Sequence, residues 1–228
     1  MRVCVCCCVA LLMMGRPAHS LQGEVAMGQQ TAPAAKPEAK PGDAAAPPLS
    51  PLSPEDKANE LSEQVGKLMV KCVNLLTAQD PLSLDYCKQQ RDLAEQYPPR
   101  QRLVDKMMAH DEYGIALAAF DHKKEALEEF DEEVALVPKA VKPGSQEWST
   151  AYWHRAMIYN QLGEIDKADR DYRAAEENFR KASFTSETSD AQSAEKKRRM
   201  ILRQHAALLQ KEGKTEAAQR LLEEASKR

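Results

Sequence analysis

Four histidines could take part in catalysis or metal binding, and they are single and dispersed along the chain: His110, His122, His154 and His205. No two of them lie four residues apart with acidic neighbours, which is the spacing of a metal site on one helix. The sequence also has no G-x-S-x-G turn for a nucleophile and no glycine-rich loop for a phosphate. His154 follows Trp153 directly, which is typical of packing. We therefore expect no enzyme activity, no metal and no cofactor.

Two charged runs are the other candidates for chemistry. The acidic run Glu128–Glu133 is interleaved with Phe130 and followed by Val134, so we interpret it as the solvated face of a helix. The basic run Lys196–Arg199 has the same simple interpretation, and its functional alternative is a docking patch for an acidic partner or anionic lipid. The formal net charge is −3, and no aromatic residues are interleaved with the basic run, so we expect no nucleic acid partner.

Cys72 and Cys87 form a candidate crosslink. They flank a turn expected near Gln79 and Asp80 almost symmetrically, and residues equidistant from the turn of an antiparallel hairpin face one another. In an oxidising compartment we expect them to form a disulfide, which would contribute about 3 kcal/mol for a loop of this length. The alternative is a pair of buried free thiols.

The ends of the chain predict export. Arg2 precedes an apolar run over residues 3–14, and Ala18 and Ser20 suit a signal-peptidase site, so residues 1–20 resemble a signal peptide cut after Ser20. An uncleaved anchor is the alternative, but the run is shorter than the ~20 residues that span a bilayer. Cleavage removes four of the six cysteines and leaves 30 basic against 35 acidic residues, a net charge of −5. We expect a periplasmic or secreted protein.

The remaining chain divides into a linker and a helical domain. Residues 21–53 are rich in alanine and proline and have little to bury, so we expect a disordered linker. From residue 54 onward apolar residues recur at three- and four-residue steps, as at Leu61, Val65 and Leu68, and no strand alternation is evident. The expected helices are paired over residues 54–78 with 81–97, 101–120 with 122–137, 146–162 with 164–182, and 188–212 with 214–227. The short connections predict an all-α antiparallel helix-hairpin solenoid over residues 54–228.

Three segments, within 101–138, 146–182 and 188–228, carry a repeated pattern of small and large residues. In the middle one the pattern is Tyr152, Ala156, Tyr159, Gly163, Ala168, Tyr172 and Ala175. The preceding segment has Gly114, Ala126, Phe130 and Pro138, with Asp121 at the turn and Glu133 in place of an alanine. The last segment has Ala206, Leu209, Gly213, Ala218, Leu222 and Ala225. This pattern resembles the tetratricopeptide repeat (TPR), with insertions near residues 139–145 and 181–190, and the hairpin at 54–97 is a degenerate first unit or a cap.

The resemblance implies a function and a site. Proteins of this family hold a peptide or partner helix in a concave groove lined by the first helix of each repeat. The positions carried across are Asp111, Ile115, Trp153, Met157, Asn160, Gln161, Arg203, Gln210 and Lys211. Trp153 and Met157 would form an apolar anchor, and Arg203 with Lys211 would hold an acidic side chain. The alternative for Trp153 is packing under the loop at 139–145 or against Trp148. We expect a non-catalytic scaffold or adaptor of the cell envelope. The alternative is an envelope assembly or chaperone-like factor that binds unfolded or envelope proteins broadly.

Overall fold

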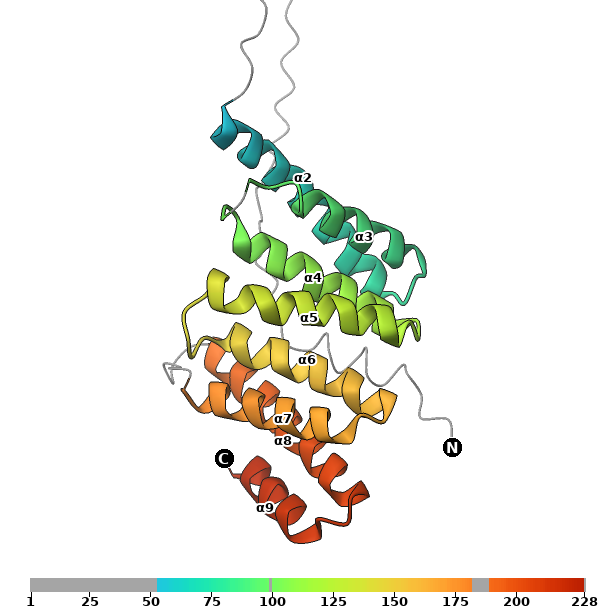
Figure 1. Ribbon diagram of the computed structural model, residues 1–228, viewed down its shortest axis with the longest axis vertical. Helices are drawn as coiled ribbons and strands as arrows, with labels where there is room; N and C mark the ends of the chain where they lie inside the picture. The colour runs from blue at the N-terminus through green and yellow to red at the C-terminus, as the bar shows by residue number, and fades with distance from the viewer. Residues whose placement is uncertain (1–52, 99, 182–188, 228) are drawn as a thin grey trace, which may run out of the picture.

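A computed structural model describes residues 53–98, 100–181 and 189–227 (Figure 1). Within these ranges the chain forms eight α-helices and no strand. They are α2 (Pro54–Thr77), α3 (Leu82–Ala94), α4 (Leu103–Ala119), α5 (Lys123–Ala140), α6 (Gln146–Leu162), α7 (Ile165–Lys181), α8 (Ser189–Lys211) and α9 (Thr215–Ser226). The predicted signal peptide and most of the predicted linker lie outside the described residues. None of the described helices combines the length and the hydropathy needed to cross a membrane.

The helices stack as consecutive antiparallel hairpins, which confirms the predicted all-α hairpin solenoid (Figure 1). Each helix packs on its neighbours in sequence, and α4 also contacts α2 and α6, while α6 contacts α8. The hairpins are α2/α3, α4/α5, α6/α7 and α8/α9, here called the first to the fourth. Two predicted ends were misplaced: α3 ends at Ala94 rather than Tyr97, and α5 continues through Pro138 to Ala140.

The same turn closes all four hairpins. Each turn has one residue with positive φ: Gln79 (58°), Asp121 (69°), Gly163 (80°) and Gly213 (75°). The following amide donates a 2.9 Å hydrogen bond to the carbonyl five residues earlier: Asp80 to Leu75, His122 to Leu117, Glu164 to Tyr159 and Lys214 to Leu209. This is the bond that ends a helix in a Schellman motif, and it satisfies a carbonyl that the helix leaves without a partner. The four hairpins are therefore repeats in local geometry as well as in order.

Small residues allow the helices of a hairpin to approach closely, as predicted. The alanines at these contacts are fully buried: Ala126, Ala156, Ala168, Ala175 and Ala218. Gly114 lies directly against the ring of Phe130, where an added Cβ would be 2.7 Å from the ring carbon Cε1. A contact this close leaves no room for a side chain, so Gly114 sets the spacing between α4 and α5.

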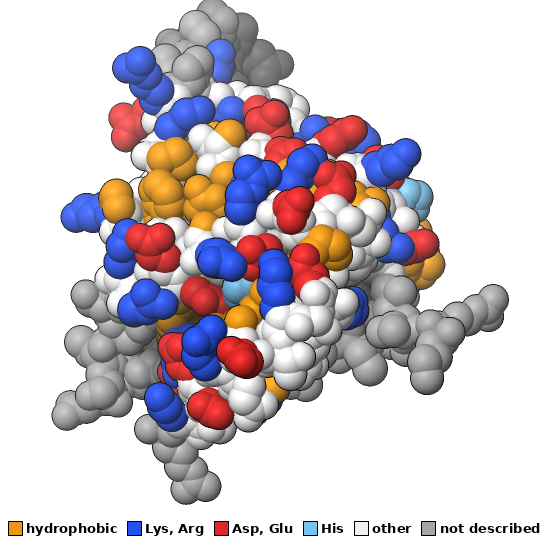
Figure 2. All heavy atoms as spheres, turned by 60° about the horizontal axis from the view of Figure 1, so that its bottom comes forward, with side chains coloured by type: hydrophobic (Ala, Val, Ile, Leu, Met, Phe, Trp, Pro, Cys, Tyr) orange, Lys and Arg blue, Asp and Glu red, His pale blue; other side chains and the backbone are white. Residues whose placement is uncertain are grey.

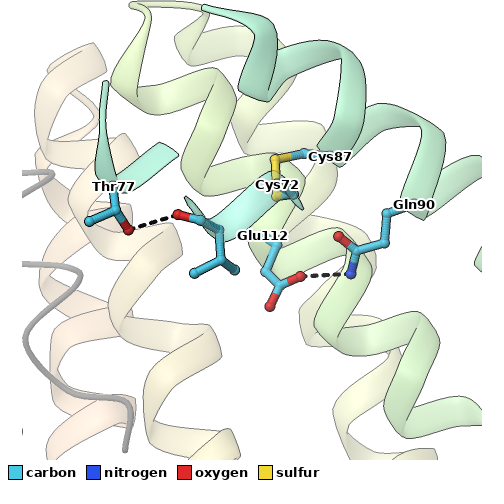
Figure 3. Close-up of a disulfide and its surroundings, with 6 residues drawn as sticks. Cys72, Thr77, Cys87, Gln90 and Glu112 are labelled. Carbon is cyan, nitrogen blue, oxygen red and sulfur yellow. Dashed lines mark hydrogen bonds between the residues drawn. A yellow bond between two sulfur atoms is a disulfide. The ribbon is translucent and has the colours of Figure 1, made fainter. Parts of the chain in front are cut away.

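The first hairpin has a covalent link (Figure 3). Cys72 of α2 and Cys87 of α3 form a disulfide, with a distance of 2.07 Å between the sulfur atoms, and both residues are fully buried. This confirms the predicted pairing. Close by, the side-chain amide of Gln90 donates a 2.6 Å hydrogen bond to the carboxylate of Glu112, which joins α3 to α4.

Candidate functional site

The first helices of the hairpins form a continuous row. Contacts of α2 with α4, of α4 with α6 and of α6 with α8 join each first helix to the next one in the stack. Two side-chain contacts fix how α6 lies beside α8. Lys197 Nζ donates to Thr150 Oγ1 at 3.2 Å, and the indole N–H of Trp153 donates to Gln204 Oε1 at 2.7 Å. The exposed surface of this row is here called the inner face.

Five of the nine predicted binding residues are accessible on the inner face. Gln161, Arg203, Gln210 and Lys211 are exposed, and Asn160 is half-buried. Asn160 and Gln161 lie ten and eleven residues after Thr150, while Gln210 and Lys211 lie near the end of α8. Thr150 and Lys197 are in contact, and from that contact α6 and α8 run in the same direction. We therefore expect the side chains of Asn160, Gln161, Gln210 and Lys211 at the same end of the inner face. Asn160 Oδ1 is buried and has no hydrogen-bond partner among the described residues.

The other four predicted binding residues are buried, which corrects the expected apolar anchor. Trp153 is 2% exposed and Met157 is 7% exposed, and both belong to a core cluster that includes Tyr172 and Ile201. The neighbours of Trp153 therefore lie in α7 and α8, and its indole N–H is satisfied by Gln204. A side chain this enclosed gives a partner almost no surface to contact. The indole fills the space between hairpins instead.

Asp111 and Ile115 are buried in α4, with exposed fractions of 4% and 7%. Ile115 packs in the cluster that contains the disulfide. Asp111 Oδ1 lies 2.6 Å from His154 Nδ1 in α6. Neither of the two predicted binding residues of α4 is therefore accessible to a partner.

The basic run is partly internal rather than a fully solvated face. Arg198 contacts Glu195 on its own helix and Glu224 on α9, each at 2.9 Å, and Arg199 contacts Glu195 at 2.9 Å. The pKa of Glu195 is lowered mainly by its hydrogen bond from Arg198. These arginines therefore stabilise the fourth hairpin. Arg203 and Lys211, also on α8, are more exposed than these two arginines, so a partner can reach them.

His205, which the sequence showed only as a single dispersed histidine, lies between two carboxylates. His205 of α8 is 3% exposed, stacks on Tyr172 and contacts two carboxylates of α7. Its Nδ1 lies 2.6 Å from Glu176 Oε1, and its Nε2 lies 2.8 Å from Asp169 Oδ1. Burial by itself lowers the pKa of His205, but the hydrogen bonds and charges of the two carboxylates outweigh burial and raise that pKa above its ordinary value. His205 therefore joins the third and fourth hairpins as an ionic bridge.

His110 forms a similar bridge between the first and second hairpins. Its Nδ1 lies 2.7 Å from Glu129 Oε2 of α5, and its Nε2 lies 3.2 Å from Glu95 Oε1 at the end of α3. Burial again acts to lower the pKa of His110, and again the two carboxylates raise it overall. Glu129, which was predicted to lie on a solvated acidic face, therefore has a structural role.

Glu133, in the same run, was also misassigned: it is 2% exposed. The sequence held one signal of this, since Glu133 stands where the repeat pattern has an alanine packed between helices. A large acid at such a position is buried unless the backbone moves away. The acids that contact the buried His110, His154 and His205 come from other helices, so no spacing along the chain could have paired them.

Comparison with known proteins adds little to these observations. No model of a known protein family matches the sequence, and no curated protein matches it. Among solved structures, the crystal structure of BtubC (BKLC) from P. vanneervenii is similar to this chain, with a TM-score of 0.49 and 16% sequence identity over 77% of this chain and 73% of that chain. A similarity at this level leaves the function to be argued from the residues of this chain.

Proposed function

We propose that this protein is a non-catalytic scaffold that holds a peptide or a partner helix on its inner face. The observation that carries the proposal is the group of accessible polar side chains on the first helices α6 and α8: Asn160, Gln161, Arg203, Gln210 and Lys211. Amide side chains can bond the backbone of a peptide, and the two cations favour an acidic partner.

The resemblance to tetratricopeptide repeats supports the same function. The four equivalent turns, the buried alanines and the contact of Gly114 with Phe130 are what such a repeat requires. Hairpin solenoids of this kind work mostly by presenting an extended surface to another protein. The disulfide suits an oxidising compartment, so we place the protein outside the cytoplasm, in the periplasm or secreted.

The broad, chaperone-like alternative relies on exposed apolar surface, above all on Trp153 and Met157. With both side chains buried, the large hydrophobic residues that are well exposed among the described residues are Val70, Leu82 and Val104. The face drawn in Figure 2 carries charges of both signs around one gathering of hydrophobic side chains. A mixed surface of this kind favours a specific partner over general capture of unfolded chains.

The test is crosslinking in cells followed by purification of the protein. The variant is Arg203→Glu/Lys211→Glu, which reverses two exposed charges of α8 without touching the core. Its matched control is Lys124→Glu/Arg220→Glu, which makes the same charge change on the exposed surfaces of α5 and α9. A discrete partner that is lost only in the first variant supports the proposal. A partner kept in both variants places the site elsewhere, and many unrelated partners favour the chaperone-like alternative.

A further inference from the structure

Three metal-ligating side chains converge in the interior of the stack. Asp111 comes from α4, Glu133 from α5 and His154 from α6, so they join three successive helices of the second and third hairpins. Each offers one ligand atom, and the three atoms all lie within 4.8 Å of one another. The residues are 4%, 2% and 4% exposed. Nitrogen and oxygen donors are thus gathered from distant parts of the sequence into one enclosed place.

The convergence is specific to His154. His110 and His205 are each flanked by two carboxylates as well, but those carboxylates lie against opposite ring nitrogens. One ion cannot contact ligands on both sides of an imidazole ring. At His154 one atom from each carboxylate and one from the ring instead lie within 4.8 Å of one another, and Asp111 Oδ1 is hydrogen-bonded to Nδ1 at 2.6 Å, a contact that a bound ion would replace. Among the described histidines, His154 is therefore the one whose surroundings suit a single ion.

The donor set suits a particular class of ion. Imidazole nitrogen with two carboxylate oxygens is a combination found around Zn²⁺, which binds both at about 2.0–2.2 Å. Mg²⁺ and Ca²⁺ prefer oxygen ligands alone and usually need more of them than this set offers.

We infer that Asp111, Glu133 and His154 bind one divalent transition-metal ion, for which Zn²⁺ is the best-suited species. A second carboxylate oxygen or a water molecule completes the four ligands. Because the set is enclosed, the ion has a structural role and does not need an open position for substrate. It fastens the second hairpin to the third at the centre of the stack, and this inference does not depend on the proposed partner binding.

The competing arrangement is a hydrogen-bonded cluster that holds no ion, built on the contact of Asp111 Oδ1 with His154 Nδ1. The two possibilities differ in what a conservative substitution does. Glu133→Gln keeps the shape and removes one negative charge, so it abolishes a metal ligand but is well tolerated by a hydrogen-bonded cluster.

The experiment is a zinc titration of the full chain by calorimetry after treatment with a chelator. Cys4, Cys6, Cys7 and Cys8 are replaced by serine, so that no thiolates compete for the ion. His122 is replaced by asparagine, because its exposed ring lies 2.8 Å from Glu125 and would give an adventitious site. We expect one Zn²⁺ per chain, bound in the micromolar range or tighter. Glu133→Gln should weaken binding by at least about tenfold, while Glu132→Gln, an exposed neighbour, should not.

X-ray absorption at the zinc edge of the protein without the Glu133 substitution gives a second measurement that does not depend on how the Glu133 variant folds. We expect nitrogen and oxygen neighbours at about 2.0–2.2 Å, including one imidazole, and no sulfur. Absence of zinc binding, equal binding by the Glu133 and Glu132 variants, or a first shell with several imidazoles would overturn the inference.

Discussion

The first and third hairpins reach the same geometry by different means. The turn of the third hairpin has glycine at its positive-φ position, Gly163, and its helices meet through the buried Ala156 and Ala168. The first hairpin places Gln79 in the same backbone conformation and is closed by the Cys72–Cys87 disulfide. The comparison indicates that the same hairpin geometry can be held by residues suited to the repeat, as in the third hairpin, or by a crosslink, as in the first.

The largest effect that this comparison predicts is the loss of the disulfide. Cys72→Ser/Cys87→Ser should lower the free energy of unfolding by about 3 kcal/mol, because the crosslink closes a loop between residues 15 apart in the sequence. Urea denaturation measures the total change, and hydrogen exchange locates it. Faster exchange should concentrate in α2 and α3 and leave α6 and α7 protected. Equal loosening of the third hairpin would contradict the comparison.

Closing the contact between α4 and α5 should have the next largest effect. Gly114→Ala should cost about 2 kcal/mol, since the new methyl group would lie 2.7 Å from a ring carbon of Phe130. Gly66→Ala is the matched control: Gly66 is also inside a helix, α2, but its added Cβ meets no atom within 4 Å. There the better helix propensity of alanine should raise stability by about 0.5–1 kcal/mol. The two substitutions should thus have opposite signs in the same urea assay, and a shared sign would refute the close approach of α4 and α5.

Exchanging the turn residues tests the comparison most directly. Gly163→Ala should lower stability by about 1 kcal/mol, because an L-residue is strained at φ 80°. Gln79→Gly, at φ 58°, should raise it by up to about 1 kcal/mol. Thermal and urea unfolding of both variants measure these changes. A loss of stability in Gln79→Gly would mean that the side chain of Gln79 contributes more than the strain of its backbone costs.

The sequence was sufficient for most of the features that local pattern sets, apart from the ends of α3 and α5. Ser53 caps α2, and its hydroxyl accepts a hydrogen bond from the Asp56 amide at 3.1 Å. Asp80 precedes α3, and its carboxylate accepts from the Leu82 amide at 2.9 Å. Helix periodicity and turn residues depend on neighbours a few positions away, so the eight helices and the paired cysteines could be predicted from them.

The candidate site was less predictable, because burial depends on residues far away in the chain. Trp153 has the residue type of a binding anchor, yet it lies at the place where α6 meets α7 and α8. His154 and His205 find their carboxylates 43 and 36 residues away, on other helices. Such partners are set by how hairpins stack, and the insertions in this chain disturb the repeat spacing from which stacking could have been estimated.

The smallest predicted effect concerns how the third hairpin holds the fourth. If this link is the ionic bridge of His205 rather than a covalent one, it should weaken with rising pH. The folded-state pKa of His205 is raised above the unfolded value of about 6.5, so its contribution is complete below that pH and is lost as pH rises through the folded pKa. The stability difference between wild type and His205→Gln should therefore shrink between pH 6 and pH 9, by on the order of 0.5 kcal/mol. Urea denaturation at four pH values measures it.

A double variant of the bridge shows whether the two carboxylates are the cause. Asp169→Asn/Glu176→Gln removes both charges that face the imidazole while keeping the shapes of the side chains. In that background, the effect of His205→Gln should no longer shrink with rising pH, because burial alone then acts on the ring and lowers the pKa of His205, which reverses the sign of the dependence. The disulfide of the first hairpin has no group that titrates in this range, so hydrogen exchange should show the pH-dependent loosening where α7 meets α8 and not between α2 and α3.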